Sequence, residues 1–245
     1  MNIEFVIKAL NIYILNNIKM KKNICIIPAR SGSKRIKNKN IVNFFGKPII
    51  YYPIKEALKS KLFDKIIVST DSKKISKLSQ KYGAQVPSLR PKSLSSSIST
   101  INEVMKFCVK KYELKKYEFL FCIFPFSPLL TALDLIKAKK MIKKNKAPHL
   151  ISVKRQNPLK QKIFIKNNKL IKQSNLKIKK IYKTNNIFVD NGNFFILNIR
   201  EYIKAYKPDY SNTIGFEMIN KDALDVNNPL DVFNTKKLFK KLKIK

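Results

Sequence analysis

The chain contains few of the residues that support disulfide-rich or metal-centred proteins. Its 245 residues include three cysteines, one histidine, five glycines and no tryptophan. Cys25, Cys108 and Cys122 lie far apart in the sequence, and two of them fall within apolar stretches. This spacing argues against a disulfide framework and predicts reduced core residues, as in a cytoplasmic protein. His149 has no partner pattern for metal binding or catalysis, so we interpret it as a structural or surface residue.

Acidic residues are also scarce. The sequence has 15 Asp and Glu residues against 52 Lys and Arg residues, which gives a formal net charge of +37. A basic nucleic-acid-binding protein on an α/β scaffold is therefore the alternative function of another class. The lysines are spread over the whole chain, however, and form no stripe interleaved with aromatic residues. We predict no dedicated nucleic-acid partner and expect the charge to attract small anionic substrates.

Long hydrophobic runs are missing as well. Residues 5–15 have amphipathic spacing but are interrupted by Lys8 and Asn11, so this stretch is too short and too polar to span a bilayer. It also lacks the small-residue cleavage site of a signal peptide. We predict no membrane partner, and we interpret residues 1–19 as an N-terminal extension or the result of a misassigned start codon. Residues 20–245 then form a single domain.

The remaining sequence alternates between short apolar stretches and amphipathic stretches. Strands are expected at residues 23–27, 65–70, 119–124, 149–153, 188–197 and 212–219, and helices at residues 49–60, 72–82, 101–111, 131–143 and 230–242. This alternation predicts an α/β fold with a mainly parallel sheet and helices on both faces. Residues 162–171 differ, because Asn167 and Asn168 separate two short apolar segments and predict a two-residue hairpin. We assign this hairpin to an inserted lobe at about residues 157–186.

A cationic loop follows the first predicted strand. Residues 27–35 read IPARSGSKR, in which small residues leave backbone N–H groups accessible and Arg30, Lys34 and Arg35 add positive charge. Backbone N–H groups and cations at the end of a buried strand are suited to hold a phosphate group. The spacing matches neither the P-loop nor the glycine pattern of dinucleotide-binding proteins. The loop is therefore predicted to bind phosphate in another arrangement.

This loop resembles the signature of the acylneuraminate cytidylyltransferases, the CMP-sugar synthetases that activate nine-carbon 2-keto acids (nonulosonic acids). Further blocks typical of this family follow in the same order: residues 39–41 (KNI), 46–49 (GKPI), 67–71 (IVSTD), 90–94 (RPKSL), 127–129 (SPL) and 225–231 (DVNNPLD). The resemblance covers about residues 21–240, and ordered blocks are more specific than any single block. It implies a Rossmann-like nucleotidyltransferase fold, whose inserted lobe contributes to a homodimer contact and caps the sugar site.

The resemblance implies transfer of CMP from CTP to the anomeric 2-hydroxyl of a nonulosonic acid, with release of pyrophosphate. Arg30, Lys34 and Asp225 are the implied catalytic residues. The implied CTP-binding residues are Ala29, Arg30, Ser31, Gly32, Ser33, Lys34, Asn40 and Asp71. Ser31 stands where the family usually has a second glycine. Asp71 has an alternative interpretation, as the N-cap of the helix that begins near residue 72.

The block at residues 225–231 implies a Mg²⁺ site. In the family, two aspartates separated by one residue bind the metal, which suits a hard cation shared between few carboxylates and substrate phosphates. Asp225 occupies the first position, but Asn227 replaces the second aspartate and offers only a neutral carbonyl ligand. This replacement predicts weaker metal binding. Alternatively, Asp225 and Asn227 form a turn ahead of a helix at Pro229.

Two features bear on the choice of sugar. Phe124 stands where the sialic acid synthetases have a glutamine, and the pseudaminic acid branch lacks that glutamine too. Residues 190–195 (DNGNFF) resemble the same branch, which assigns Asp190, Asn193 and Phe194 to the sugar site. Pseudaminic acid is therefore the favoured substrate, and CMP-sialic or CMP-legionaminic acid synthesis is the alternative. A catalytically weak relative, or a nucleotidyltransferase for 3-deoxy-manno-octulosonate or hexose phosphates, also remains open.

Overall fold

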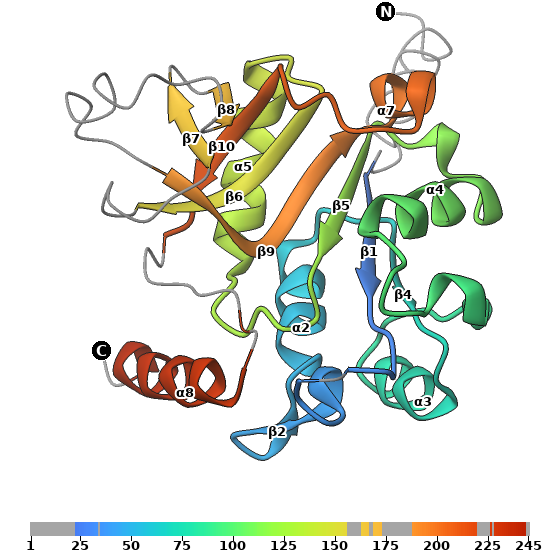
Figure 1. Cartoon of the computed structure of the whole chain (residues 1–245), viewed down its shortest axis with the longest axis vertical. Coiled ribbons are helices and arrows are strands. Elements are labelled where there is room, and N and C mark those ends of the chain that lie inside the picture. The colour runs from blue at the N-terminus through green and yellow to red at the C-terminus, as the bar shows by residue number, and fades with distance from the viewer. Residues whose placement is uncertain are drawn as a thin grey trace, which may run out of the picture.

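The computed structural model describes residues 23–33, 35–155, 163–166, 169–172, 188–219, 226 and 228–243. Its centre is a six-stranded sheet with the strand order β10-β6-β9-β5-β1-β4 (Figure 1). The strands are β1 (Asn23–Pro28), β4 (Lys65–Ser69), β5 (Phe119–Ile123), β6 (His149–Arg155), β9 (Phe188–Asn198) and β10 (Thr213–Glu217). Each strand begins and ends within two residues of its predicted bounds.

Most strand pairs of this sheet are parallel. β1 pairs in parallel with β4 and β5, and β6 pairs in parallel with β10. β9 lies between β5 and β6 and is antiparallel to both, so its arrowhead points away from that of β1 in Figure 1. The predicted mainly parallel sheet is confirmed. The sequence carries no signal for the reversed direction of β9, because strand direction depends on partners far along the chain.

Helices cover both faces of the sheet (Figure 1). They are α2 (Tyr51–Ser60), α3 (Lys73–Lys81), α4 (Ile101–Lys111), α5 (Ala132–Lys144), α7 (Ile199–Ala205) and α8 (Pro229–Lys243). Alternate residues of β1 enter two separate cores. Cys25 and Ile27 pack in the cluster that includes α2 and α5, whereas Ile24 and Ile26 pack in the cluster that includes α4 and α7. Burial of both strand faces explains the continuous apolar runs in the sequence.

Two elements carry no clear sequence signal. The short helix α7 follows β9 directly, and Asn198 accepts a hydrogen bond from Glu201 N as its N-cap. The second is a hairpin of β2 (Asn43–Phe44) and β3 (Lys47–Pro48). Its turn residues, Phe45 and Gly46, have φ angles of 48° and 78°, as a tight two-residue hairpin turn requires.

The predicted hairpin at residues 162–171 is confirmed. β7 (Ile163–Lys166) pairs antiparallel with β8 (Lys169–Lys172), and Lys166 lies opposite Lys169. The two turn residues and the rest of the lobe expected at about residues 157–186 lie outside the described residues, as do residues 1–19. The division into extension, domain and inserted lobe therefore stays a prediction.

The cysteines and the histidine are packed in the protein interior. Cys25, Cys108 and Cys122 are free and buried, as expected for core residues. His149 is 3% exposed, and its Nδ1 atom lies 2.8 Å from Thr213 Oγ1. Burial lowers the pKa of His149 to about 4, so the ring is neutral at pH 7. The interpretation of His149 as a structural residue agrees with this environment.

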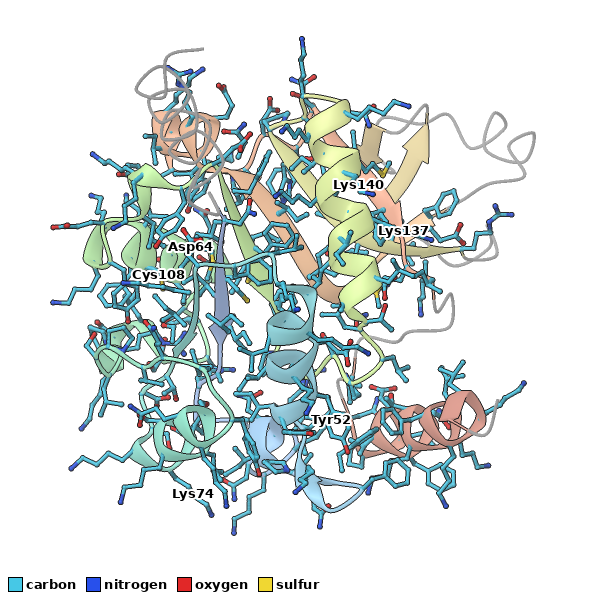
Figure 2. All side chains as sticks on the ribbon, turned by 180° about the vertical axis from the view of Figure 1, so that it is seen from behind. Tyr52, Asp64, Lys74, Cys108, Lys137 and Lys140 are labelled. Carbon is cyan, nitrogen blue, oxygen red and sulfur yellow. The ribbon has the colours of Figure 1, made fainter. Side chains whose placement is uncertain are left out.

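Lysine side chains extend from several helices. Lys74 of α3 and Lys137 and Lys140 of α5 are exposed (Figure 2). Lys74 lies on a different helix from Lys137 and Lys140, in agreement with the spread of lysines in the sequence. Within the part of the chain that the structure describes, no helix is both long and apolar enough to cross a membrane.

Candidate active site

A cavity of about 620 Å³ opens at the edge of the sheet where the parallel strands β1, β4 and β5 end. Its walls come from the loop after β1, the segment between α3 and α4, the residues that follow β5, and β9. Ligands of open α/β sheets bind at this carboxyl-terminal edge. A larger cavity of about 910 Å³ lies near α7 and the start of β10, and no predicted site residue lines it.

Cationic side chains line the smaller cavity. Arg30, Arg35 and Lys39 come from the loop after β1, and Arg90 comes from the segment between α3 and α4. The Arg30 guanidinium also donates a hydrogen bond to the carbonyl of Ser96. The positive charge that the sequence predicts for the loop after β1 therefore lies at the cavity wall.

Arg90 is the cavity residue whose role sequence reasoning missed. It is 4% exposed, its backbone N–H donates to Thr70 O at 2.7 Å, and its Nε donates to Ser95 Oγ at 3.1 Å. Burial lowers the pKa of Arg90, while the negative charge of Asp71 acts in the opposite direction. A buried arginine beside a cavity is a functional signal, but in the sequence Arg90 stands out only as the start of the block at residues 90–94, with no role assigned to it.

Asp71 ties the end of β4 to the loop after β1. Its Oδ1 accepts a hydrogen bond from Ser31 N at 2.8 Å, and its Oδ2 accepts one from Ser31 Oγ at 2.6 Å. The N-cap of α3 is Ser72, whose Oγ accepts from Ile75 N at 3.3 Å. The alternative interpretation of Asp71 as the helix cap is therefore wrong.

Ser31 fits the loop without the conformational freedom of glycine. It is absent from the described residues that have a positive φ angle, so an ordinary side chain is accommodated at this position. Its hydroxyl binds Asp71, which a glycine could not do. The departure from the family pattern thus adds a hydrogen bond to the loop.

The other loop residues have different surroundings. The space around Gly32 is empty, since a Cβ atom added there would meet nothing within 4 Å. Ser33 lines the cavity, although its N–H donates to Ser31 O at 3.0 Å. Ala29 is fully buried, and its N–H donates to Ser69 O at 2.9 Å. Lys34 lies outside the described residues.

The side chain of Asn40 is hydrogen-bonded to the loop after β1. It is 8% exposed, and its Nδ2 donates a hydrogen bond of 2.8 Å to Arg30 O. It also lines the cavity. The predicted nucleotide-binding residues Arg30, Ser33 and Asn40 therefore lie together, whereas Ala29 and Asp71 contact the protein itself.

A bulge in β9 forms the opposite side of the cavity. Ile151 of β6 lies opposite Phe195, and Val153 lies opposite Asp190, so residues 191–194 of β9 face the single residue Ser152. Such a bulge places extra residues on one strand and changes the direction of its side chains. Asp190 and Gly192 line the cavity from this bulge.

Two of the three predicted sugar-binding side chains do not reach the cavity. Phe194 is 1% exposed and packs in the core, with its ring centroid 6.0 Å from that of Phe216. Asn193 is 2% exposed, and its Nδ2 donates to Asn191 O at 2.9 Å. Only Asp190 lies at the cavity. The bulge accounts for this correction, because it directs Phe194 into the core and the Asn193 amide towards the carbonyl of Asn191.

The predicted metal ligands Asp225 and Asn227 lie outside the described residues. Val226, which stands between them, is 1% exposed and packs with Ile36 and Phe126. Phe126 also lines the cavity. The described residues contain no group of three or more His, Cys, Asp or Glu side chains that could hold a metal ion.

A mostly parallel sheet with a cationic cavity at its strand ends is the architecture of a nucleotide-binding α/β protein of the nucleotidyltransferase class. The structure resembles that of a CMP:2-keto-3-deoxy-manno-octonic acid synthetase solved in complex with CTP, with a TM-score of 0.69. The two chains are 14% identical, and the match covers 89% of this chain and 98% of the other. At this identity the likeness concerns the fold alone.

The chain belongs to the cytidylyltransferase family, because the model of that family, described as "Cytidylyltransferase", matches residues 24–226. A pseudaminic acid cytidylyltransferase of Campylobacter jejuni is 41% identical over 118 residues, which are 47% of this chain and 50% of that protein. A CMP-N,N'-diacetyllegionaminic acid synthase of Legionella pneumophila is 30% identical over 225 residues, which are 88% of this chain and 95% of that protein. Three relatives named for pseudaminic acid are matched over 24% to 57% of their own lengths, so the chain spans about half of them or less.

Proposed function

We propose that the chain transfers CMP from CTP to the anomeric 2-hydroxyl of a nonulosonic acid and releases pyrophosphate. The observation that carries this proposal is the cavity at the strand edge, where Arg30, Arg35 and Arg90 converge. Attack on a phosphorus atom of a triphosphate needs charge neutralisation and alignment more than covalent help from the protein. The converging cations supply that neutralisation.

The loop after β1 is assigned to the triphosphate. Arg30 and Lys34 would bind its oxygens directly, and the space above Gly32 would let a phosphate approach the backbone. Asn40 and Asp71 hold this loop by hydrogen bonds to Arg30 and Ser31. These two residues are therefore proposed to act by positioning the loop in addition to any contact with CTP.

A Mg²⁺ ion is proposed to bind at Asp225 and Asn227. Carboxylate and amide oxygens are hard ligands that suit this ion, and when bound it would neutralise further phosphate charge. The structure supports this proposal through Val226, which stands between the two residues in the sequence. Val226 packs with Phe126, and Phe126 lines the cavity. Asp225 provides the charged ligand, and Asn227 provides at most a neutral one.

Pseudaminic acid is the proposed acceptor. Its support is the sequence of residues 190–195, the phenylalanine at position 124, and relatives that carry this sugar in their names. The alternative is a sialic or legionaminic acid, because the legionaminic acid synthase of Legionella pneumophila matches along nearly the whole chain. We further propose a cytoplasmic homodimer that needs neither a membrane nor a nucleic-acid partner.

Incubation with CTP, Mg²⁺ and a panel of nonulosonic acids tests the reaction. Pyrophosphate and a CMP-sugar are expected only when a nonulosonic acid is present, with pseudaminic acid turned over most efficiently. Hexose 1-phosphates serve as the control, and equal turnover with them would refute the proposal. A titration with duplex nucleic acid at increasing salt examines the alternative of a nucleic-acid-binding protein, for which tight salt-dependent binding without turnover is expected.

A further inference from the structure

The cavity has two chemically different halves. One half carries the cations of the loop after β1, together with Arg90. The other half is mainly apolar, with the lining side chains Ile101, Val104, Phe124, Pro125 and Phe126, although Lys39 Nζ lies 5.0 Å from the centroid of the Phe126 ring and Asp190 lines the cavity from β9. None of the five apolar side chains can donate or accept a strong hydrogen bond. A ligand that fills the cavity therefore contacts cations of the loop after β1 as well as apolar side chains such as Phe124.

The order of strands shows which part of the reaction the apolar half faces. β1, β5 and β9 are consecutive in the sheet, so the phosphate loop, Phe124 and Asp190 follow one another along the same edge. A triphosphate held by Arg30 lies at the β1 position of this row. The space from Phe124 to Asp190 is then available to the acceptor, on the β9 side of the triphosphate.

Phe124 is held in place by the β9 bulge. Its N–H donates to Asn193 O at 2.9 Å, and its ring meets that of Phe195 edge-on, with 6.1 Å between the centroids. Ser127 Oγ donates to the same Asn193 carbonyl at 3.0 Å, which fixes the turn after β5. The anchored ring of Phe124 therefore offers a rigid apolar surface to an acceptor that binds in this space.

We propose that Phe124 is a specificity-determining residue, which contacts the end of the acceptor side chain and favours an acid ending in a methyl group over one ending in a hydroxymethyl group. This inference rests on the proposed function. A terminal hydroxyl packed on the Phe124 ring would lose water on that side and gain no hydrogen bond from the ring, whereas a methyl group would lose nothing. Discrimination of this kind in an apolar pocket amounts to about 10- to 100-fold in kcat/KM.

The test uses two acids that differ by a single hydroxyl, N-acetylneuraminic acid and its 9-deoxy derivative. We expect the wild type to favour the deoxy acid, F124Q to reduce this preference to less than about threefold, and F124L to retain it because leucine is also apolar. KM for CTP and the melting temperature are measured for each variant and should stay near wild type. For an acid that is not turned over, its inhibition constant against the preferred acceptor replaces kcat/KM.

The outcomes separate this inference from the function on which it rests. A wild type that makes no CMP-sugar from any nonulosonic acid refutes the proposed function and the inference together. A wild type that is active, but whose preference is absent or is unchanged in F124Q, refutes the inference alone. A change confined to KM for CTP also refutes it, because Phe124 would then contact the nucleotide. Loss of the preference in F124Q, with retention in F124L, supports it.

Discussion

The loop after β1 and the bulge of β9 face each other across the same cavity but use their polar residues in opposite ways. In the loop, Arg30 and Arg35 direct charge towards the cavity. In the bulge, Asn191 and Asn193 are 1% and 2% exposed, and their side chains bind protein atoms such as Val153 O and Asn191 O. A polar residue beside a site therefore serves the ligand in one region and the backbone in the other.

The physical reason for this difference lies in the backbone groups that each region leaves unpaired. A bulge interrupts the hydrogen bonds between strands, so nearby polar side chains must replace them inside a buried sheet. Ser152 Oγ accordingly donates to Asn191 Oδ1 at 2.7 Å and accepts from Phe194 N at 3.0 Å. The loop lies at the end of the sheet, where Arg30 can point towards a ligand. Variants in the loop should thus alter activity, and variants in the bulge should alter stability.

The largest effect is expected at the proposed metal ligands, Asp225 and Asn227. Asp225→Asn should abolish turnover, whereas Asn227→Asp should lower the Mg²⁺ concentration needed for half-maximal activity, because carboxylates bind this ion more tightly than neutral carbonyls. Activity titrations against Mg²⁺ measure both effects. Unchanged turnover and Mg²⁺ dependence in Asp225→Asn would place the metal elsewhere.

A smaller but still large effect is expected at Arg30. Arg30→Ala should lower kcat/KM by at least about tenfold, because a charge-assisted contact with phosphate contributes about 1.5 to 3 kcal/mol. Arg200, an exposed arginine of α7, provides the matched control variant Arg200→Ala, which should behave as wild type. Steady-state kinetics for CTP decide the matter, and equal kinetics in the two variants would exclude the loop as the triphosphate site.

A moderate effect is expected at Gly32, where the protein leaves empty space. Gly32→Ala should raise KM for CTP by roughly fivefold, the equivalent of about 1 kcal/mol, because a methyl group would hinder the approach of a phosphate to the backbone. The melting temperature should stay unchanged. Gly46→Ala is the contrasting control, since Gly46 has a φ of 78° and the change should cost about 1 kcal/mol of stability without altering KM. Wild-type KM in Gly32→Ala would contradict a backbone contact.

The smallest effect on catalysis is expected in the bulge. Phe194→Leu should lower the free energy of unfolding by about 1 kcal/mol, because it changes the shape of a buried side chain, and should leave KM for the acceptor as in wild type. Denaturant unfolding and acceptor kinetics together provide the check. A raised acceptor KM at unchanged stability would make Phe194 a sugar contact and remove the contrast between the two regions.

Much of the fold follows from local sequence signals. The bounds of α4 match the prediction, since Thr100 and Glu103 form a capping box and the apolar residues that follow have helical spacing. β5 consists of five buried residues and stands out as an apolar run. The β2–β3 hairpin and the helix α7 give no such signal. Both are too short for a pattern of apolar residues to repeat, so their formation depends on packing.

The candidate site likewise contains residues that a local sequence pattern indicates and residues that only tertiary contacts bring to their positions. The residues of the loop after β1 are consecutive or nearly so, and their spacing indicated a phosphate site. Arg90 comes from a segment about sixty residues further on, and its burial beside the cavity depends on contacts with Thr70 and Ser95. The positions of Asn193 and Phe194 depend on the register between β6 and β9, in which a shift changes the direction of every side chain.

The sequence by itself determined the alternation of strands and helices, the cationic loop and the resemblance to the cytidylyltransferases, because each depends on residues that are close along the chain. The tertiary structure alone decided the antiparallel direction of β9, the burial of Asn193 and Phe194, and the meeting of Arg90 and Phe124 in one cavity. These features depend on contacts between distant segments. Their energy comes from pairing and packing partners that a local sequence pattern does not contain.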